Sequence, residues 1–154
     1  VAAFLLAFAW TLSASDSSEF SGKVVRILDG DTIEVMHGGK PERIRLHGID
    51  CPEKSQAFGT RAKQLTADLV GAKQVTVRVK DRDRYGRTVA EIVLTDGRVL
   101  NHELVKAGMA WWYRRYAPHD TALQKLEEEA RAAKVGLWVD PHPVPPWEFR
   151  HRKR

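Results

Sequence analysis

IRLHGIDCPE, residues 44–53, is the stretch that decides the fold of this chain. Its first half alternates apolar residues with the outward-facing Arg45, as a half-buried strand does. The strand runs into two carboxylates, Asp50 and Glu53, three residues apart across a proline. An arginine followed closely by two carboxylates indicates that the end of this strand belongs to a functional site as well as to the fold.

The segments on either side of this stretch predict a small barrel. Strands are expected at 24–28, 32–36, 42–46, 75–80 and 87–94, and helices at 56–70, 101–107 and 121–134. Ser55 and Asn101 are the expected caps of the first two helices. Five short strands with one helix between the third and fourth, and more helix after the fifth, suit an OB-type barrel. We therefore expect an α+β fold, mainly β: a five-stranded OB-fold barrel with three helices.

The two ends of the chain differ from its middle. Residues 1–15 begin with an uncharged, almost wholly apolar run and end in small residues, a pattern typical of a signal peptide. We expect a signal peptide or N-terminal hydrophobic segment here and an exported protein, secreted or periplasmic; the alternative is a membrane anchor. Residues 16–138 are then the folded domain. Residues 139–154 are a Pro-rich basic tail that we expect to be extended.

The charge balance limits what can be said about partners. The formal net charge is +5, but residues 150–154 hold four of the 25 Lys and Arg and none of the 20 Asp and Glu. A nucleic-acid interface must therefore come from local clustering, most strongly at residues 78–87, which also read as a solvated strand and turn. Cys51 is the only cysteine, so no intramolecular disulfide forms. The six histidines show no metal-ligand spacing, and a zinc site is not expected.

Two further motifs complete a possible active site. An acidic turn, DGDT at 29–32, lies about twenty residues upstream of the carboxylates, and a basic turn, DRYGR at 83–87, lies downstream. Each by itself is an ordinary strand-connecting turn. Carboxylates for a hard cation, a carboxylate to handle water and two arginines for a phosphate are together the parts of a metal-assisted phosphodiesterase.

In this order and spacing the motifs resemble those of the staphylococcal-nuclease (thermonuclease) family. The resemblance rests on DGDT at 29–32, RLHGIDCPE at 45–53, DRYGR at 83–87 and GLW at 136–138. It covers roughly residues 24–138. Any one motif is weak, but all of them on the expected strands make a specific pattern.

The resemblance implies a calcium site. Its ligands would be Asp31, Asp50 and the backbone carbonyl of Cys51, with Asp29 near them but outside the coordination shell. A hard cation prefers oxygen ligands, and so few from protein leave room for water and a substrate phosphate. The thiol of Cys51 would take no part.

The resemblance also implies the catalytic residues. Glu53 would activate or orient the attacking water, as suits a carboxylate beside a metal-bound phosphate. Arg45 and Arg87 would clamp the phosphate, because guanidinium matches phosphate bidentately and offsets the extra charge of the transition state.

Substrate contacts beyond the phosphate are expected from Arg84, Tyr85 and Tyr116, which match positions that contact the neighbouring nucleotide and its phosphate. The chain departs from the best-known member by carrying Arg114 where that protein has tyrosine. The adjacent tryptophans at 111–112 can either stack on bases or pack in the core, and we expect core packing.

The expected activity is calcium-dependent hydrolysis of phosphodiester bonds in DNA and RNA by an exported, sugar-nonspecific nuclease. The resemblance implies a preference for single strands and 3′-phosphate products. We expect no small-molecule organic cofactor. We expect a monomer. The alternative is a catalytically inactive OB-fold module that binds nucleic acid, tethered to a membrane or not.

Overall fold

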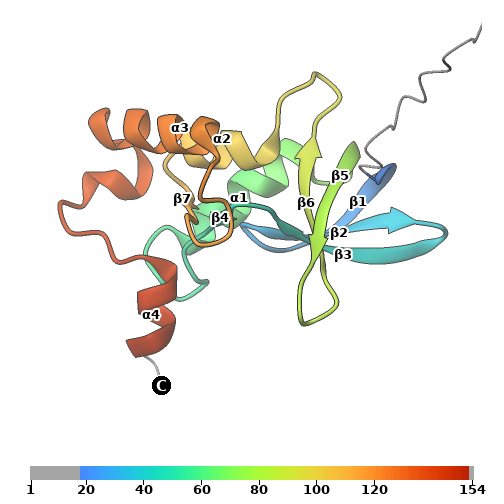
Figure 1. The fold of residues 1–154 in the computed structure, drawn as a ribbon, viewed down its shortest axis with the longest axis horizontal. Coiled ribbons are helices and arrows are strands. Elements are labelled where there is room, and N and C mark those ends of the chain that lie inside the picture. Colours follow the sequence, from blue (N-terminus) through green and yellow to red (C-terminus); the bar gives the residue numbers. More distant parts are fainter. Residues whose placement is uncertain (1–17, 153–154) are drawn as a thin grey trace, which may run out of the picture.

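The computed structural model describes residues 18–152, which form a closed five-stranded barrel with helices packed beside it (Figure 1). Around the barrel the strand order is β1-β2-β3-β6-β5. Neighbouring strands are antiparallel except β3 and β6, which pair in parallel. The strands are β1 (Glu19–Asp29), β2 (Thr32–His37), β3 (Lys40–Leu46), β5 (Gln74–Arg82) and β6 (Thr88–Val93). The expected five-stranded OB-type barrel is confirmed.

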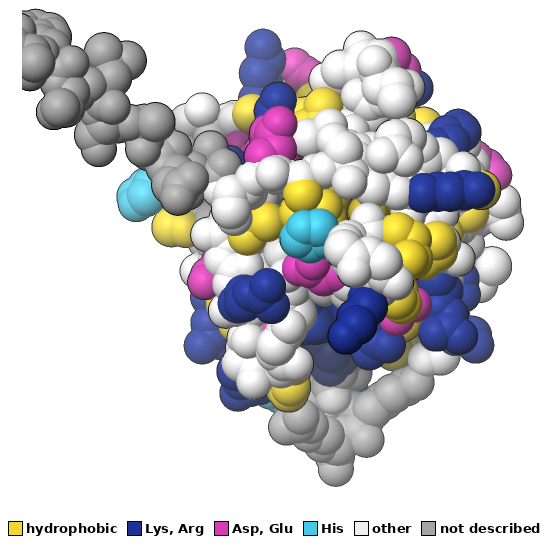
Figure 2. All heavy atoms as spheres, turned by 90° about the vertical axis from the view of Figure 1, so that its right-hand side faces the viewer, with side chains coloured by type: hydrophobic (Ala, Val, Ile, Leu, Met, Phe, Trp, Pro, Cys, Tyr) yellow, Lys and Arg dark blue, Asp and Glu magenta, His cyan; other side chains and the backbone are white. Residues whose placement is uncertain are grey.

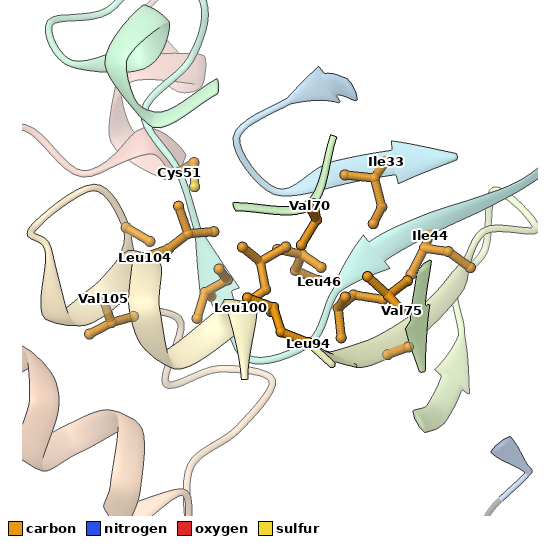
Figure 3. Close-up of a cluster of buried hydrophobic side chains, with 14 of the residues drawn as sticks. Ile33, Ile44, Leu46, Cys51, Val70, Val75, Leu94, Leu100, Leu104 and Val105 are labelled. Atoms are coloured by element: carbon orange, nitrogen blue, oxygen red, sulfur yellow. The ribbon is translucent and has the colours of Figure 1, made fainter. Parts of the chain in front are cut away.

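The core follows from the alternation of apolar residues along these strands. Ile33 on β2 pairs with Ile44 on β3, and both side chains are fully buried inside the barrel. Figure 3 shows these side chains in one cluster with Val75 of the barrel and with Leu100 and Leu104. Strand alternation and helical spacing thus supply one continuous apolar interior.

The remaining elements lie outside the barrel. They are β4 (Ile49–Asp50), α1 (Gly59–Val70), α2 (Leu100–Lys106), β7 (Trp111–Trp112), α3 (Thr121–Ala132), a 3₁₀ turn at Gly136–Val139 and α4 (Pro146–Arg152). Strands β4 and β7 pair with each other as a second, two-stranded sheet. Helices α2 and α3 lie side by side, whereas α4 projects from the lower side of the molecule (Figure 1).

Helix α1 starts later than expected. The N-terminal cap is Phe58, in a left-handed conformation with φ of 67°, and not Ser55. The chain first makes a turn in which the N–H of Gln56 bonds to the carbonyl of Glu53 at 2.8 Å. A side chain at Gly59 would lie 2.0 Å from that same carbonyl, so the helix begins at a residue without a Cβ.

The expected cap of α2 was also wrong. Val99 occupies the cap position, and Asn101 lies inside the helix with its side chain buried. That amide donates to the carbonyl of His47 at 2.9 Å and accepts from the N–H of Ile92 at 3.1 Å. Asn101 therefore ties the helix to the barrel instead of closing its first turn.

The C-terminal segment was expected to be extended, and this was wrong for residues 146–152. They form helix α4, with Pro146 at the first helical position, where its fixed φ suits a helix and no N–H is lost. The ring of Trp147 stacks on that of Tyr113, with 5.1 Å between centroids and 4° between planes. The barrel therefore has four α-helices around it, and the fourth is held by aromatic packing.

The segment 1–15, expected to be a signal peptide, lies outside the described residues. Within residues 18–152, every helix is too short or too polar to cross a bilayer.

The core makes one stability prediction. Leu104→Ala should lower the free energy of unfolding by about 2–5 kcal/mol, because a fully buried leucine leaves both lost burial and a cavity. Val25→Ala is the control, since Val25 is 48% exposed on β1, and it should change stability by less than about 1 kcal/mol. Urea denaturation at constant pH measures both; equal losses in the two variants would contradict the assignment of Leu104 to the core.

Candidate active site

Asp31, Arg45 and Asp50 come together where the ends of strands β1 to β4 meet. Asp31 lies in the turn between β1 and β2, Arg45 near the end of β3, and Asp50 on β4. The N–H of Leu46 bonds to the carbonyl of Asp31 at 2.9 Å, which joins the acidic turn to the end of β3. Asp50 pairs with Trp111 across the two-stranded sheet. Segments about twenty residues apart in sequence are thereby brought to one point.

Arg45 connects the two aspartates. Its Nη2 lies 3.1 Å from Oδ1 of Asp50 and 3.4 Å from Oδ2 of Asp31, while Nη1 donates to the carbonyl of Leu46 at 3.0 Å. The N–H of Cys51 donates to Oδ2 of Asp31 at 2.7 Å. The structure thus brings Asp31, Asp50, Cys51 and Arg45 together, and their expected roles stay predictions.

Burial decides the electrostatics of this cluster. Asp31 is 7% and Asp50 2% exposed, and Arg45 is largely buried beside them. Burial raises the pKa of Asp50 above its ordinary value, although Arg150 and Arg45 oppose the shift. Burial also raises the pKa of Asp29, and the charges of Asp31 and Glu53 raise it further. A positive charge close to these carboxylates favours their ionised form and opposes the effect of burial, as Arg45 and Arg150 do.

Arg45 stays charged in spite of its burial. Burial by itself would lower its pKa, but the nearby Asp31 and Asp50 reverse this and hold the pKa above the ordinary value. A permanently charged, planar guanidinium with donors to spare is suited to an incoming phosphate.

Glu53 stands at the solvent side of the buried pair. Its side chain is 38% exposed, and its N–H donates to Oε1 of Gln56 at 3.1 Å, which shapes the loop before α1. Glu53 is thus exposed to water and linked through Arg150 to the buried Asp50. This position suits a general base that takes a proton from water.

One residue of the cluster was missed by the sequence motifs. Arg150 on α4 donates from Nη1 to Oε1 of Glu53 at 2.7 Å and from Nη2 to Oδ2 of Asp50 at 2.8 Å. The Pro-Pro pair before Trp147 was a signal for a helix start, because proline favours the first helical position. Nothing local indicates that this helix reaches residues 100 positions upstream.

Arg87 directly precedes β6, the strand whose Val89 pairs with Arg45 of β3, but its side chain bonds to Asp83. Its Nε donates to Oδ2 of Asp83 at 2.6 Å, and its guanidinium lies over the ring of Tyr85 at 5.6 Å. Burial alone would raise the pKa of Asp83, but hydrogen bonds from the backbone and side chain of Arg87 hold it below its ordinary value. Within residues 18–152, no hydrogen bond or ion pair joins Arg87 to the carboxylate cluster, and its role as a phosphate clamp stays a prediction.

The expected substrate residues are exposed. Tyr85 is 70% exposed, with Nη2 of Arg84 bonded to its hydroxyl at 2.8 Å, and both lie on the β5–β6 turn. Tyr116 is 62% exposed and packs edge-on against Tyr113. The β5–β6 turn and α4 project on the same lower side of the molecule (Figure 1), and Lys and Arg side chains gather over the lower half of the face shown in Figure 2. Exposed rings and basic groups are what a nucleic-acid strand requires.

The neighbouring tryptophans are structural, as expected. Trp111 and Trp112 are each 6% exposed. The guanidinium of Arg114 lies over the ring of Trp112 at 4.8 Å and pairs with Glu127, whose carboxylate accepts the N–H of Trp112. Arg114 therefore braces the core, and within residues 18–152 no hydrogen bond or ion pair joins it to Asp31, Asp50 or Glu53.

The donor set fits a hard cation. Asp31 and Asp50 each have a carboxylate oxygen near the same nitrogen of Arg45. The guanidinium of Arg150 contacts both Asp50 and Glu53, so Asp50 and Glu53 already accommodate a positive charge between them. Among the residues that the structure describes, no group of three or more His, Cys, Asp or Glu side chains is arranged to hold a metal ion. Two carboxylates and a carbonyl would be an open site, which calcium completes with water and substrate oxygens.

A buried carboxylate pair bridged by arginine, with a partly exposed glutamate linked to it through Arg150, defines the class of site on this barrel: one suited to cleaving phosphodiesters. Comparison with known proteins agrees. The family model described as "Staphylococcal nuclease homologue" matches residues 43–140.

The chain is 48% identical over 149 residues to an "Uncharacterized endonuclease" of Escherichia coli O157:H7, covering 97% of this chain and 95% of that protein. It is 44% identical over 146 residues to "Micrococcal nuclease" of Shigella flexneri, covering 89% and 84% of the two chains. The chain belongs to the staphylococcal nuclease family, and the protein is a nuclease, a hydrolase.

Proposed function

We propose that the protein is an exported, calcium-dependent, sugar-nonspecific nuclease. It hydrolyses phosphodiester bonds in DNA and RNA, favours single strands, leaves 3′-phosphates and works as a monomer. The observation that carries this proposal is the buried pair Asp31 and Asp50, bridged by Arg45 and flanked by Glu53. The apolar segment at residues 1–15 supports export.

Each residue has a distinct part in the proposed reaction. Asp31, Asp50 and the carbonyl of Cys51 would hold calcium, which supplies Lewis-acid polarisation of a phosphoryl oxygen. Glu53, which is partly exposed, takes a proton from the attacking water. The water oxygen bonds to phosphorus as the bond to the 5′-oxygen breaks; the 5′-oxygen leaves as a hydroxyl with a proton from solvent, and the phosphate stays on the 3′ side. Arg45 donates hydrogen bonds to the phosphoryl oxygens and offsets the charge that grows as water adds.

Binding of the strand would extend from this cluster towards the β5–β6 turn. Arg87 would hold the same phosphate after exchanging Asp83 for it, because the pentacoordinate transition state carries more negative charge than the single charge of Asp83. Arg84, Tyr85 and Tyr116 would contact the adjacent nucleotide. Stacking on exposed tyrosine needs an unpaired base, which accounts for a preference for single strands.

Removal of calcium tests the proposal. Cleavage of single-stranded DNA and of RNA by the purified protein should be lost with a chelator and return when calcium is added in excess. The products should carry 3′-phosphates, which a phosphatase-dependent change in gel mobility detects. Cleavage that persists in the chelator would contradict the metal requirement. Binding of the strand without cleavage in calcium would favour the inactive binding module.

A further inference from the structure

The C-terminal helix places a positive charge inside the candidate active site. Arg150 of α4 contacts Asp50 with both terminal nitrogens, Nη1 to Oδ1 at 3.3 Å and Nη2 to Oδ2 at 2.8 Å, and contacts Glu53 at 2.7 Å. This fork-like pairing is the strongest geometry that an arginine makes with a carboxylate. The contact joins the expected metal ligand to the expected base.

The position of α4 is set by packing and not by this ion pair alone. Trp147 stacks on Tyr113 and meets Trp111 edge-on at 5.6 Å. The side-chain amide of Gln56 donates to the carbonyl of Val144, just before the helix. Trp147 also packs against the buried cluster that holds Trp138. An aromatic anchor therefore delivers Arg150 to the carboxylates.

Arg150 and a metal ion compete for the same atoms. Oδ1 of Asp50 already accepts from Arg45 and Arg150, and Oδ2 accepts from Arg150. Calcium approaches carboxylate oxygens to about 2.3–2.6 Å, where a guanidinium at hydrogen-bonding distance from both oxygens would be repelled. The two cations exclude each other at Asp50.

We propose that α4 is a self-docking inhibitory helix, in which Arg150 takes the place of the metal ion at Asp50 and Glu53. This inference rests on the proposed calcium site. With Arg150 docked, the buried Asp50 has a second cationic partner besides Arg45, which offsets the cost of its burial when no metal is bound. Calcium and the substrate must displace Arg150, so the docked helix lowers the affinity for calcium and holds the enzyme inactive when calcium is scarce.

Calcium binding itself, measured by isothermal titration calorimetry on the full chain with calcium chloride and no nucleic acid, tests this proposal. Arg150→Gln should bind calcium at least about tenfold more tightly than wild type, within the usual range of coupling between sites. Arg150→Lys keeps the positive charge but cannot contact both carboxylate oxygens at once, so its calcium affinity should lie between those of wild type and Arg150→Gln. Arg152→Gln is the matched control on the same helix, since Arg152 pairs with Glu148 and should leave the affinity unchanged.

A second measurement follows the helix. The indole N–H resonance of Trp147, assigned by comparison with Trp147→Phe, should move on calcium addition to wild type as Arg150 leaves the site. Thermal unfolding without calcium confirms that each variant is folded before titration. These readouts do not depend on nuclease activity.

The outcomes separate this proposal from the calcium site itself. Equal calcium affinity in wild type, Arg150→Gln and Arg152→Gln would overturn the inhibitory helix and leave the metal site standing. Weaker binding by Arg150→Gln would overturn it in favour of a supporting role for Arg150. No calcium binding by any variant would overturn the metal site and this inference with it.

Discussion

The Glu53→Gln variant is expected to hydrolyse single-stranded DNA about 10²–10⁴-fold more slowly than wild type at saturating calcium and substrate. The amide has the shape of the carboxylate but cannot take a proton from water. It can still accept the hydrogen bond from Arg150, so the protein without calcium should keep this contact and stay folded. The loss should therefore appear in the turnover number.

The matched control is Glu128→Gln. Glu128 lies on the outer face of α3, where its carboxylate accepts from Gln124 at 3.0 Å, so the same chemical change should leave turnover unaffected. Single-turnover cleavage of a labelled oligonucleotide measures the chemical step, and thermal unfolding verifies the fold. A folded Glu53→Gln protein with wild-type turnover would remove Glu53 from the mechanism.

Arg87→Ala should slow cleavage by about 10²–10³-fold, the cost of removing one donor that stabilises developing charge. The prediction depends on Arg87 leaving Asp83 for the phosphate. The turn itself should survive, because the carboxylate of Asp83 also accepts the backbone N–H groups of Tyr85 and Arg87. The defect should therefore be one of rate and not of folding.

Arg82→Ala serves as the control for Arg87→Ala. Arg82 lies on the same hairpin, and its exposed guanidinium lies 3.6 Å from Glu42, away from the carboxylate cluster. Its removal lowers the local positive charge by the same amount and should change the rate by no more than a few-fold. Equal rates for the two variants, both folded, would show that Arg87 acts only through general charge.

Local pattern accounts for most of the fold. The alternation of apolar residues predicted the five barrel strands, because a strand exposes alternate faces and only one faces the core. Helical spacing predicted α1, α2 and α3 within a few residues at most ends. The errors occur at caps. Phe58 replaces Ser55 and Val99 replaces Asn101, because tertiary contacts of the neighbouring residues decide where each helix starts.

The candidate site was predictable in its parts. The motifs named Asp31, Asp50, Cys51, Arg45 and Glu53, and the barrel brings them together. Motif spacing reports residue types and order, which persist across a family. It does not report the partner that a long, flexible side chain takes, and so it did not pair Arg87 with Asp83.

The sequence by itself determined the barrel and the type of chemistry, because each depends on periodicity or on short motifs. The bridge that Arg45 makes between Asp31 and Asp50 was not expected from the motifs, which indicated a phosphate clamp. Only the tertiary structure decided that the basic tail folds into α4 and that Arg150 reaches Asp50 and Glu53. Seven residues form a helix that is marginal alone in water. Stacking of Trp147 on Tyr113 stabilises it, and that contact joins positions too distant in sequence for any local pattern to record.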